Sequence, residues 1–455
     1  MELANKKVLV VGAGISGFAA AKLVKRLGAV VALSDAKLEK DIKYDLNELR
    51  DAGIRLLLGK QEESQLTGVE LVIVSPAVPV RIPLLQAALQ RGIEVMSEVE
   101  LAYRLAKAPL YAVTGTNGKT TTVTLLGLLM ETKYGHAHTG VGGNIGVPLC
   151  EEVMRVGAEG CTAAEISSYQ MEASQLFHPR IAAILNVTPD HVVRHGSLAV
   201  YQQMKERIFA QQTKDDYLVL NYDDEHTRSM AQRAGSTVFF FSRQQKLKEG
   251  AFVEDSMLTI HWQGKEQKLC RIDELGIKGG HNVENALAAA SVAFLAGAEP
   301  EKMVQVLRSF RGVEHRIEPV TTVSGVEYFN DSKATNTDSA IKALETFPDH
   351  IVLLAGGDDK MTELTDFMQL VVERVDELIL LGDAAARFKE AALKQGFAAA
   401  HIHEAGYSME KAVMLAHDLA KPPQVVLLSP ACASFDMFDG YEERGRVFKD
   451  LVKKL

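Results

Sequence analysis

Cysteine is scarce in this sequence and follows no pattern. Among 455 residues there are four cysteines, and no two of them form a C-x-x-C pair. This scarcity argues against a disulfide framework and against a zinc site with cysteine ligands. We therefore expect reduced thiols at Cys150, Cys161, Cys270 and Cys432.

Long hydrophobic runs are also missing. No apolar stretch approaches the roughly 20 residues that a membrane-spanning helix requires. The first residues, MELANKKVLVVGAG, run directly into a glycine turn and lack the cleavage site of a secretory signal. We expect a cytoplasmic protein with no membrane partner.

Positive charge is not in excess either. The chain has 50 Lys and Arg residues against 59 Asp and Glu residues, which gives a formal net charge of -9. Such a balance leaves no basic footprint for nucleic acid, and we expect no nucleic-acid partner. Anionic ligands would have to be held by local arrangements of the chain.

Strand and helix patterns alternate along the chain, which is too long for a single hydrophobic core. This alternation favours an α/β fold with largely parallel sheets. We predict three domains, at residues 1–97, 98–312 and 313–455. Glycine and proline are spread along the sequence, so the linkers between domains should be short.

The stretch YAVTGTNGKTTT, residues 111–122, reads as a strand, a phosphate-binding loop and the start of a helix. Backbone N–H groups in such a loop can point at phosphate oxygens, Lys119 adds a charge, and Thr120 offers a hydroxyl to Mg²⁺. Val113 stands where the standard pattern has glycine, so the loop is a shortened form. The alternative is a glycine-rich turn with an incidental lysine. The candidate nucleotide residues are Gly115, Thr116, Asn117, Gly118, Lys119, Thr120 and Thr121.

A second glycine motif, GAGISG, lies near the start of the chain. It precedes a helix pattern and a strand that ends at Asp35, as in a dinucleotide-binding unit. Only about three strands fit before the next domain, which is half of such a unit. The motif therefore suits a UDP group as well as NAD. Ser75, at the end of the third strand, is a ligand contact or part of a structural turn.

Several polar residues of the central segment follow strands. Glu165 ends one strand, where an acid could bind Mg²⁺ or cap a turn, and His191 ends another, as a ligand or a structural histidine. Asn144, in GVGGNIGVP, could face a ligand or supply turn geometry. Lys205 lies in a helix pattern, and composition alone predicts an exposed lysine.

Two asparagines and the third segment add further candidates. Asn282 and Asn285 are three apart and share a helix face, as a cap and a polar position or as nucleotide contacts. After residue 312, each predicted strand ends in a polar loop: NDSKATN, GGDDK, GDAAAR and SPACASFD. Ligands usually bind at such carboxyl-end loops.

Together these motifs resemble the Mur ligase family, whose members are ATP-dependent amide-forming enzymes of peptidoglycan synthesis. The resemblance rests on GAGISG, GTNGKTT, GGNIG, EISSYQ, NVTPDH, HNVENALAA, NDSKATN and SPACASFDMF. It implies a Rossmann-like N-terminal domain, a central P-loop-type ATPase domain and a Rossmann-like C-terminal domain. NDSKATN with SPACASFD points most strongly to the members that add D-glutamate.

The resemblance implies that ATP phosphorylates the alanine carboxylate of UDP-N-acetylmuramoyl-L-alanine and that the D-glutamate amine then attacks the acyl phosphate. Lys119, Arg316 and Lys333 would supply positive charge. One Mg²⁺ would bind at Thr120 and Glu165 and a second at His191, with Mn²⁺ as a possible substitute. Lys205 would carry a carbamate derived from CO₂.

The resemblance also assigns ligand contacts and implies a monomer. The sugar nucleotide would contact Ile15, Ser16, Asp35, Ser75, Asn144 and His191. Adenosine would contact Asn282, Asn285 and Asp331, and D-glutamate would contact Thr335, Lys360, Ser434 and Tyr441. The loop GGDDKMT lacks the usual flanking glycines, Ala77 replaces a glycine, and Val193 replaces an acid.

Three rival functions remain open on sequence grounds. An NAD-dependent oxidoreductase would explain the first glycine motif but not the Gly-Lys-Thr loop. A nucleotide-switched binding protein would hydrolyse nucleotide without an amino acid. A related ligase could add L-alanine or a diamino acid, which an assay with exchanged acceptors would reveal.

Overall fold

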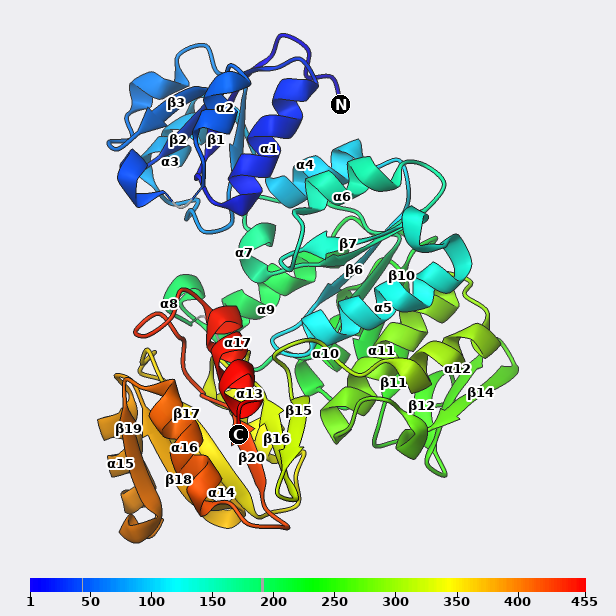
Figure 1. Ribbon diagram of the computed structural model, residues 1–455. Helices are drawn as coiled ribbons and strands as arrows, with labels where there is room; N and C mark the ends of the chain where they lie inside the picture. The colour runs from blue at the N-terminus through cyan, green and yellow to red at the C-terminus, as the bar shows by residue number, and fades with distance from the viewer. Residues whose placement is uncertain (43, 190–191) are drawn as a thin grey trace. The chain divides into compact units, whose positions relative to one another are not determined.

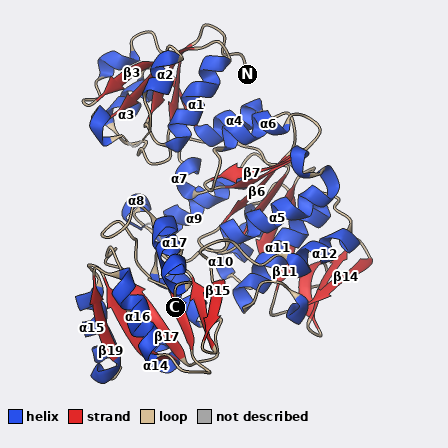
Figure 2. Ribbon diagram, viewed as in Figure 1, coloured by secondary structure: helices blue, strands red, loops and turns tan. Residues whose placement is uncertain are grey.

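A computed structural model describes residues 1–42, 44–189 and 192–455 (Figure 1). Helices and strands alternate and build three sheets (Figure 2), which confirms the predicted α/β fold. The chain forms two compact units, one of residues 1–275 with 283–309 and one of residues 276–282 with 310–455. Within the described ranges, no helix has both the length and the apolar character needed to cross a membrane.

The N-terminal sheet has five parallel strands in the order β3-β2-β1-β4-β5, so the expectation of about three is wrong. The overlooked strands are β3 and β5, which have four residues each and begin with the charged Arg55 and Glu94. Such short edge strands give a weak alternation signal. The elements are β1 (Lys7–Val11), α1 (Ile15–Arg26), β2 (Val30–Asp35), α2 (Asn47–Asp51), β3 (Arg55–Leu58), β4 (Leu71–Val74), α3 (Pro83–Gln90) and β5 (Glu94–Ser97).

The central sheet has nine strands in the order β14-β13-β12-β11-β10-β9-β6-β8-β7. It is parallel from β7 to β12 and ends in an antiparallel meander, β12-β13-β14. Its strands are β6 (Leu110–Thr114), β7 (Thr139–Gly143), β8 (Cys161–Glu165), β9 (Ile181–Ile184), β10 (Tyr217–Asn221), β11 (Thr237–Ser242), β12 (Gly250–Glu254), β13 (Met257–Trp262) and β14 (Lys265–Arg271).

Helices cover this sheet and join it to the N-terminal one. Ala19 and Leu23 of α1 share a buried hydrophobic cluster with Val99 of α4 and Leu149 of α6. Burying each large apolar side chain contributes roughly 1.5–3 kcal/mol, so the shared cluster ties the two sheets together. The helices are α4 (Glu98–Leu105), α5 (Lys119–Tyr134), α6 (Leu149–Val156), α7 (Ser168–Met171), α8 (Val192–His195), α9 (Leu198–Glu206), α10 (Glu225–Met230), α11 (Gly280–Leu295) and α12 (Pro300–Ser309).

The C-terminal sheet has six strands in the order β15-β16-β20-β17-β18-β19 and is parallel except for β15. Alternate residues of β17 face two hydrophobic clusters: Leu353 packs with α13, α14 and α15, and Leu354 packs with α16 and α17. The elements are β15 (Glu318–Val323), β16 (Val326–Asn330), α13 (Thr337–Leu344), β17 (Ile351–Gly356), α14 (Thr365–Arg374), β18 (Val375–Leu381), α15 (Ala385–Lys394), β19 (Ile402–Gly406), α16 (Met409–Leu419), β20 (Val425–Leu428) and α17 (Tyr441–Val452).

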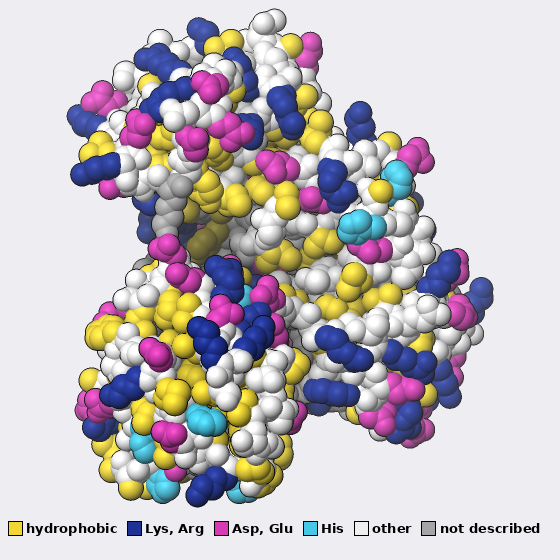
Figure 3. Space-filling view, viewed as in Figure 1, with side chains coloured by type: hydrophobic (Ala, Val, Ile, Leu, Met, Phe, Trp, Pro, Cys, Tyr) yellow, Lys and Arg dark blue, Asp and Glu magenta, His cyan; other side chains and the backbone are white. Residues whose placement is uncertain are grey.

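The surface carries both signs of charge. On the face in Figure 3, basic and acidic side chains are intermixed, in keeping with the formal net charge of -9. We therefore expect ligand-binding sites in the loops at the carboxyl ends of the parallel strands.

Candidate functional site

The glycine-rich loop lies between β6 and α5, as the sequence predicts. Gly118 precedes the first residue of α5 and has a left-handed φ of 83°. A Cβ atom there would lie 2.2 Å from Oδ1 of Asn285, so the position requires glycine for both backbone and space. The 16-residue helix α5 therefore begins at this loop, and the dipole at the N-terminus of the helix favours an anion there.

Asn186, which sequence reasoning missed, holds the loop from the end of β9. Its Oδ1 accepts hydrogen bonds from the backbone N–H groups of Thr116 (3.0 Å) and Asn117 (2.8 Å). Its Nδ2 donates to the Asn117 carbonyl at 3.2 Å. In this structure the Asn117 N–H is therefore used within the protein, in holding the loop. Asn186 lies within the NVTPDH motif, but its partners are about 70 residues earlier in the chain.

Two lysines converge on one carbonyl of this loop. Nζ of Lys119 donates to the carbonyls of Gly115 (3.0 Å) and Thr116 (2.7 Å). Nζ of Lys205 donates to the same Gly115 carbonyl at 2.7 Å and lies 4.2 Å from the centre of the Tyr201 ring. Lys205 is only 1% exposed, so the prediction of an exposed lysine from composition is wrong. Helix α9 turns it inward toward the loop.

Glu165 ends β8, directly beside β6, and is 1% exposed. Its Oε1 accepts a hydrogen bond from Nδ2 of Asn144 at 2.8 Å, which brings two predicted site residues together. Its Oε2 is buried and has no hydrogen-bond partner among the described residues. The hydroxyls of Thr114 and Thr121 are also buried and have no hydrogen-bond partner in the described part of the chain. A buried carboxylate oxygen without a donor suits a hard cation.

His191, predicted as a metal ligand and substrate contact, lies outside the described residues. Thr120, at the start of α5, is 7% exposed. Asn285 is buried, and its Oδ1 accepts from the Thr122 hydroxyl at 3.3 Å. Asn282 is also buried and donates through Nδ2 to the Lys278 carbonyl at 2.7 Å.

The N-terminal candidates gather at the carboxyl edge of the first sheet. Ile15 is half exposed and Ser16 buried at the start of α1, and Ser75 is buried after β4. Asp35 ends β2. Its carboxylate accepts hydrogen bonds from the backbone N–H groups of Ala13 (2.6 Å) and Lys37 (2.8 Å). Asp35 thus holds the glycine turn in this structure.

A bridge from the central domain holds the loop that follows Ser75. Arg194 donates twice to the Glu172 carboxylate, at 2.8 Å each, and contacts the carbonyl of Val78 at 3.3 Å. Its guanidinium lies over the Tyr169 ring at 4.8 Å. Because Arg194 follows the NVTPDH motif, the central domain directly supports the loop beyond β4.

In the C-terminal unit, Asp331 follows β16 and is 4% exposed. It accepts hydrogen bonds from the Ser429 hydroxyl (2.8 Å) and from the Ile317 backbone (3.2 Å). Burial raises the pKa of Asp331 to about 7, although the nearby Arg316 acts in the opposite direction. Nζ of Lys333 lies 3.2 Å from the Tyr441 hydroxyl, so these predicted residues meet.

Arg444 was not predicted, yet it joins the two loops that carry these candidates. It is 1% exposed, and its guanidinium donates to the carbonyls of Ser332 (2.7 Å), Ala433 (2.9 Å) and Cys432 (3.1 Å). Burial lowers its pKa to about 10. Its partner Ser332 lies 112 residues earlier, so no local pattern could reveal the contact.

The remaining D-glutamate candidates lie on neighbouring loops. Ser434 is buried and Lys360 is exposed. The preceding residues connect them, because the Asp358 backbone N–H donates to the Ala433 carbonyl at 3.1 Å. Thr335 is half-buried, and its backbone N–H donates to the Lys333 carbonyl at 2.9 Å.

Arg387 of α15 anchors the Lys360 loop. It makes two bonds to the Asp359 carboxylate, at 2.6 and 2.7 Å, and a third to the Thr362 carbonyl at 3.0 Å. Its hydrogen bonds lower the pKa of Asp359. The loop GGDDKMT, which differs from the usual glycine-flanked form, is thus held by Arg387.

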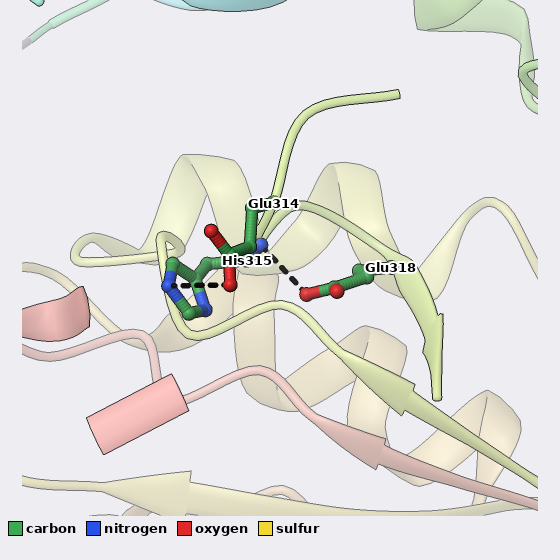
Figure 4. A group of neighbouring side chains, drawn as sticks. All are labelled: Glu314, His315 and Glu318. Atoms are coloured by element: carbon green, nitrogen blue, oxygen red, sulfur yellow. Dashed lines mark hydrogen bonds and ion pairs between the residues drawn. The ribbon is translucent and has the colours of Figure 1, made fainter. Parts of the chain in front are cut away.

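One group in the described part of the chain combines metal-ligating side chains. Possible ligand atoms of Glu314, His315 and Glu318 lie within 4.8 Å of one another (Figure 4). Nζ of Lys449 donates to Glu314 at 2.6 Å and to Glu318 at 3.0 Å. The negative charge of the two carboxylates is thus offset by an ammonium group.

Comparisons with known proteins cover all three sheets. Family models match residues 6–97 (Mur ligase MurD-like, N-terminal domain), 113–293 (Mur ligase middle domain) and 315–432 (Mur ligase, glutamate ligase domain). A UDP-N-acetylmuramoylalanine--D-glutamate ligase of Thermoanaerobacter sp. (strain X514) is 44% identical over 455 residues, 100% of both chains. That of Pelotomaculum thermopropionicum is 45% identical over 454 residues, covering 100% of this chain and 99% of the relative.

Solved structures share the fold at lower identity. A pseudomurein peptide ligase type C from Methanothermus fervidus has a TM-score of 0.60 and 19% identity, covering 99% of this chain and 100% of that one. The MurF ligase from Thermotoga maritima, solved in complex with ADP, has a TM-score of 0.60 and 16% identity, covering 100% of this chain and 96% of that one. These similarities concern the fold alone.

Proposed function

Because the chain belongs to the Mur ligase family, we propose that it is an ATP-dependent ligase that joins D-glutamate to the alanine carboxylate of UDP-N-acetylmuramoyl-L-alanine, in peptidoglycan precursor synthesis. The observation that carries the proposal is the 44% identity over the full chain to curated D-glutamate ligases. The products would be the amide, ADP and phosphate.

The central loop fits ATP and Mg²⁺. Thr120 and Glu165 would hold one Mg²⁺, and the buried Oε2 of Glu165 that lacks a donor supports this role. His191 and Lys205 would hold a second ion, and Mn²⁺ could replace either. The metal ions would neutralise charge on the phosphoryl group during transfer.

The reaction requires that a carboxylate become a good electrophile. A carboxylate has a poor leaving group, so the γ-phosphate of ATP is passed to it and the amine then displaces phosphate. Every species along this path is polyanionic, so positive charge around the transferring oxygens lowers the barrier. We assign this role to Lys119, Arg316 and Lys333.

Lys205 is assigned as the carbamylated lysine. In the structure its ammonium shares the Gly115 carbonyl with Lys119, which places two cations beside one loop. A carbamate formed from CO₂ would replace one of these cations by an anion with oxygen ligands for a metal. The burial of Lys205 supports a role inside the site rather than on the surface.

The remaining contacts follow the family pattern. Ile15, Ser16, Asp35, Ser75, Asn144 and His191 would bind the sugar nucleotide. Gly115, Thr116, Asn117, Gly118, Thr121, Asn282, Asn285 and Asp331 would bind ATP. Thr335, Lys360, Ser434 and Tyr441 would bind D-glutamate, whose two carboxylates need a cation and several donors. We also propose a cytoplasmic monomer with domains at residues 1–97, 98–312 and 313–455.

An ADP-release assay with exchanged amino acids tests the proposal. ADP and phosphate should appear only when ATP, Mg²⁺, the sugar nucleotide and D-glutamate are all present. L-Alanine and a diamino acid should not replace D-glutamate. Amide formation without nucleotide consumption, or equal rates with another acceptor, would contradict the assignment.

Lys119→Ala tests the loop itself. The variant should lose activity by about a hundredfold or more, because it removes charge compensation at the phosphates. The matched control is Lys133→Ala. Lys133 lies near the other end of the same helix, and its ammonium donates to the Ala296 carbonyl rather than to the loop. An unchanged rate for Lys119→Ala would remove the loop from the mechanism.

A further inference from the structure

The turn that presents Arg316 has an unusual backbone on both sides of that residue. His315 has a φ of 65° and Ile317 a φ of 45°, both in the left-handed region. A β-branched residue in this region is an outlier, and such conformations persist only where the surroundings hold them. The position of Arg316 therefore depends on what fixes residues 314–318.

Hydrogen bonds from neighbouring side chains hold the His315 side of the turn. The His315 N–H donates to Oε2 of Glu318 at 2.9 Å, and the same oxygen accepts from Nδ2 of Asn330 at 3.0 Å. That Nδ2 also lies 2.9 Å from Nδ1 of His315, which is 3% exposed. Gly445 leaves room for the ring, because a Cβ atom there would lie 2.2 Å from Nδ1 of His315.

Lys449 closes the turn from outside. It lies on α17, more than 130 residues later in the chain, and its ammonium bonds to Glu314 (2.6 Å) and Glu318 (3.0 Å) at the two ends of the turn. Its side chain is 13% exposed, against 59% for Glu314 and 25% for Glu318. The hydrogen bond from Lys449 lowers the pKa of Glu314. Without Lys449, the ammonium that bridges the two carboxylates would be lost, and Glu318 would keep the hydrogen bonds from His315 and Asn330.

Fewer interactions hold the side chain of Arg316 than hold the backbone of the turn. Its Nε is buried and has no hydrogen-bond partner among the described residues. Its charge lowers the pKa of the buried Asp331, but no hydrogen bond joins the two side chains among the described contacts. The direction of this side chain is therefore set largely by the turn that bears it.

We propose that Lys449 is a positioning residue for the ligase reaction: by clamping Glu314 and Glu318 it fixes the turn that aims Arg316 at the transferring phosphoryl group. This inference rests on the proposed function for the role of Arg316. The clamp itself is seen in the hydrogen bonds of the C-terminal unit. The same group is not assigned as a metal site, because the ammonium already serves both carboxylates.

Steady-state kinetics of three variants test the role. Lys449→Gln should lower kcat/KM for ATP by about tenfold and leave KM for D-glutamate unchanged, since other residues bind that substrate. Lys449→Arg keeps the charge and should restore activity to within about twofold of wild type. The control is Lys454→Gln, an exposed lysine near the same end of the chain, which should behave as wild type.

Hydrogen exchange tests the clamp independently of activity. The backbone amides of His315 and Ile317 should exchange about tenfold faster in Lys449→Gln than in wild type and Lys454→Gln, because the turn opens more often. Unchanged exchange overturns the inference. An equal loss of kcat/KM in Lys449→Gln and Lys449→Arg overturns it as well, because the restored charge should restore the turn.

The two proposals fail in different ways. If wild type releases no ADP with all substrates present, the ligase assignment fails, and faster exchange in Lys449→Gln would still support the clamp. If wild type is active and Lys449→Gln matches Lys454→Gln in kinetics and exchange, the clamp fails and the ligase assignment stands.

Discussion

At the scale of single residues, the site depends on charged groups whose surroundings fix their chemistry. Glu165 places a carboxylate oxygen in a buried position without a donor, and Lys205 places an ammonium on a loop that already has one. A carboxylate oxygen without a donor and a second cation are both costly to bury. A metal beside Glu165 and a carbamate on Lys205 would relieve both costs.

Lys205→Ala tests the carbamate. The variant should lose activity by about a hundredfold or more, since a metal ligand is removed. Acetate or formate should restore part of the rate, because a small carboxylate can occupy the space of the carbamate. Lys119→Ala is the control, since a lost cation cannot be replaced by an anion. Equal responses of the two variants to acetate would show that Lys205 carries no carbamate.

Glu98, at the start of α4, makes stability depend on pH. It is 1% exposed; Oε1 accepts from the Cys150 backbone at 2.6 Å, and Oε2 has no partner in the described chain. Burial raises its pKa from 4.5 to about 7. The folded state therefore keeps a proton that the unfolded state releases, so the contribution of Glu98 to stability is greatest below pH 4.5 and falls as the pH rises to about 7.

Glu98→Gln should remove this dependence. Between pH 4.5 and 7 the free energy of unfolding of wild type should fall by about 3 kcal/mol relative to the variant and stay level above that range. Urea denaturation at a series of pH values measures the difference. Glu301→Gln, at an exposed acid, should follow wild type throughout. Parallel curves for wild type and Glu98→Gln would mean that Glu98 is ionised at no cost.

At the scale of elements, the glycine motif of the first sheet allows helix α1 to pack closely against the turn that follows β1, because Gly17 has no Cβ atom. A Cβ atom on Gly17 of α1 would lie 1.8 Å from the Gly12 carbonyl oxygen. The oxygen belongs to the backbone and the position of a Cβ atom is fixed by the backbone, so no side-chain rotation can relieve the clash. At Gly14 an added Cβ would meet only the Ser75 hydroxyl, at 3.6 Å.

Gly17→Ala should therefore move α1 away from the turn after β1. We expect a loss of about 1–3 kcal/mol in stability and a higher KM for the sugar nucleotide. Gly14→Ala, in the same motif, should cost less than about 1 kcal/mol. Calorimetry and substrate titration measure both effects. Similar melting temperatures for the two variants would show that the helix can shift without cost.

The sequence predicts elements and contiguous motifs well, because each depends on neighbours in the chain. The loop before α5 and the glycine turn before α1 are of this kind. Contacts between distant segments leave no such signal: Lys205 and Gly115 are 90 residues apart, and Arg444 and Ser332 are 112 apart. The inward direction of Lys205 and the role of Arg444 therefore appear only when the sheets are formed.

At the scale of the whole molecule, the proposed reaction draws on both compact units. Lys119 and Glu165 belong to the unit of residues 1–275 and 283–309, whereas Arg316 and Lys333 belong to the other unit. All four are assigned to the same phosphoryl transfer. Binding of ATP and the sugar nucleotide should therefore draw the two units into one defined arrangement.

A distance measurement between the units tests this. The native cysteines are buried, and burial raises the pKa of Cys161 and Cys432 to about 12, so they should react slowly with maleimide dyes. Dyes on Lys265→Cys and Lys394→Cys, at exposed positions in the two units, should then report their separation by energy transfer. Adding a non-hydrolysable ATP analogue with the sugar nucleotide should narrow the distance distribution and shift its mean.

The control separates binding from closure. In a labelled Lys119→Ala chain the analogue should produce no shift, because the cation that holds its phosphates is gone. If the wild-type distribution stays the same with every substrate while ADP is still released, the residues of the second unit do not act on the transferring group. Arg316 and Lys333 would then have to be reassigned, while the loop before α5 would keep its role, because its lysines lie on the Gly115 carbonyl within a single unit.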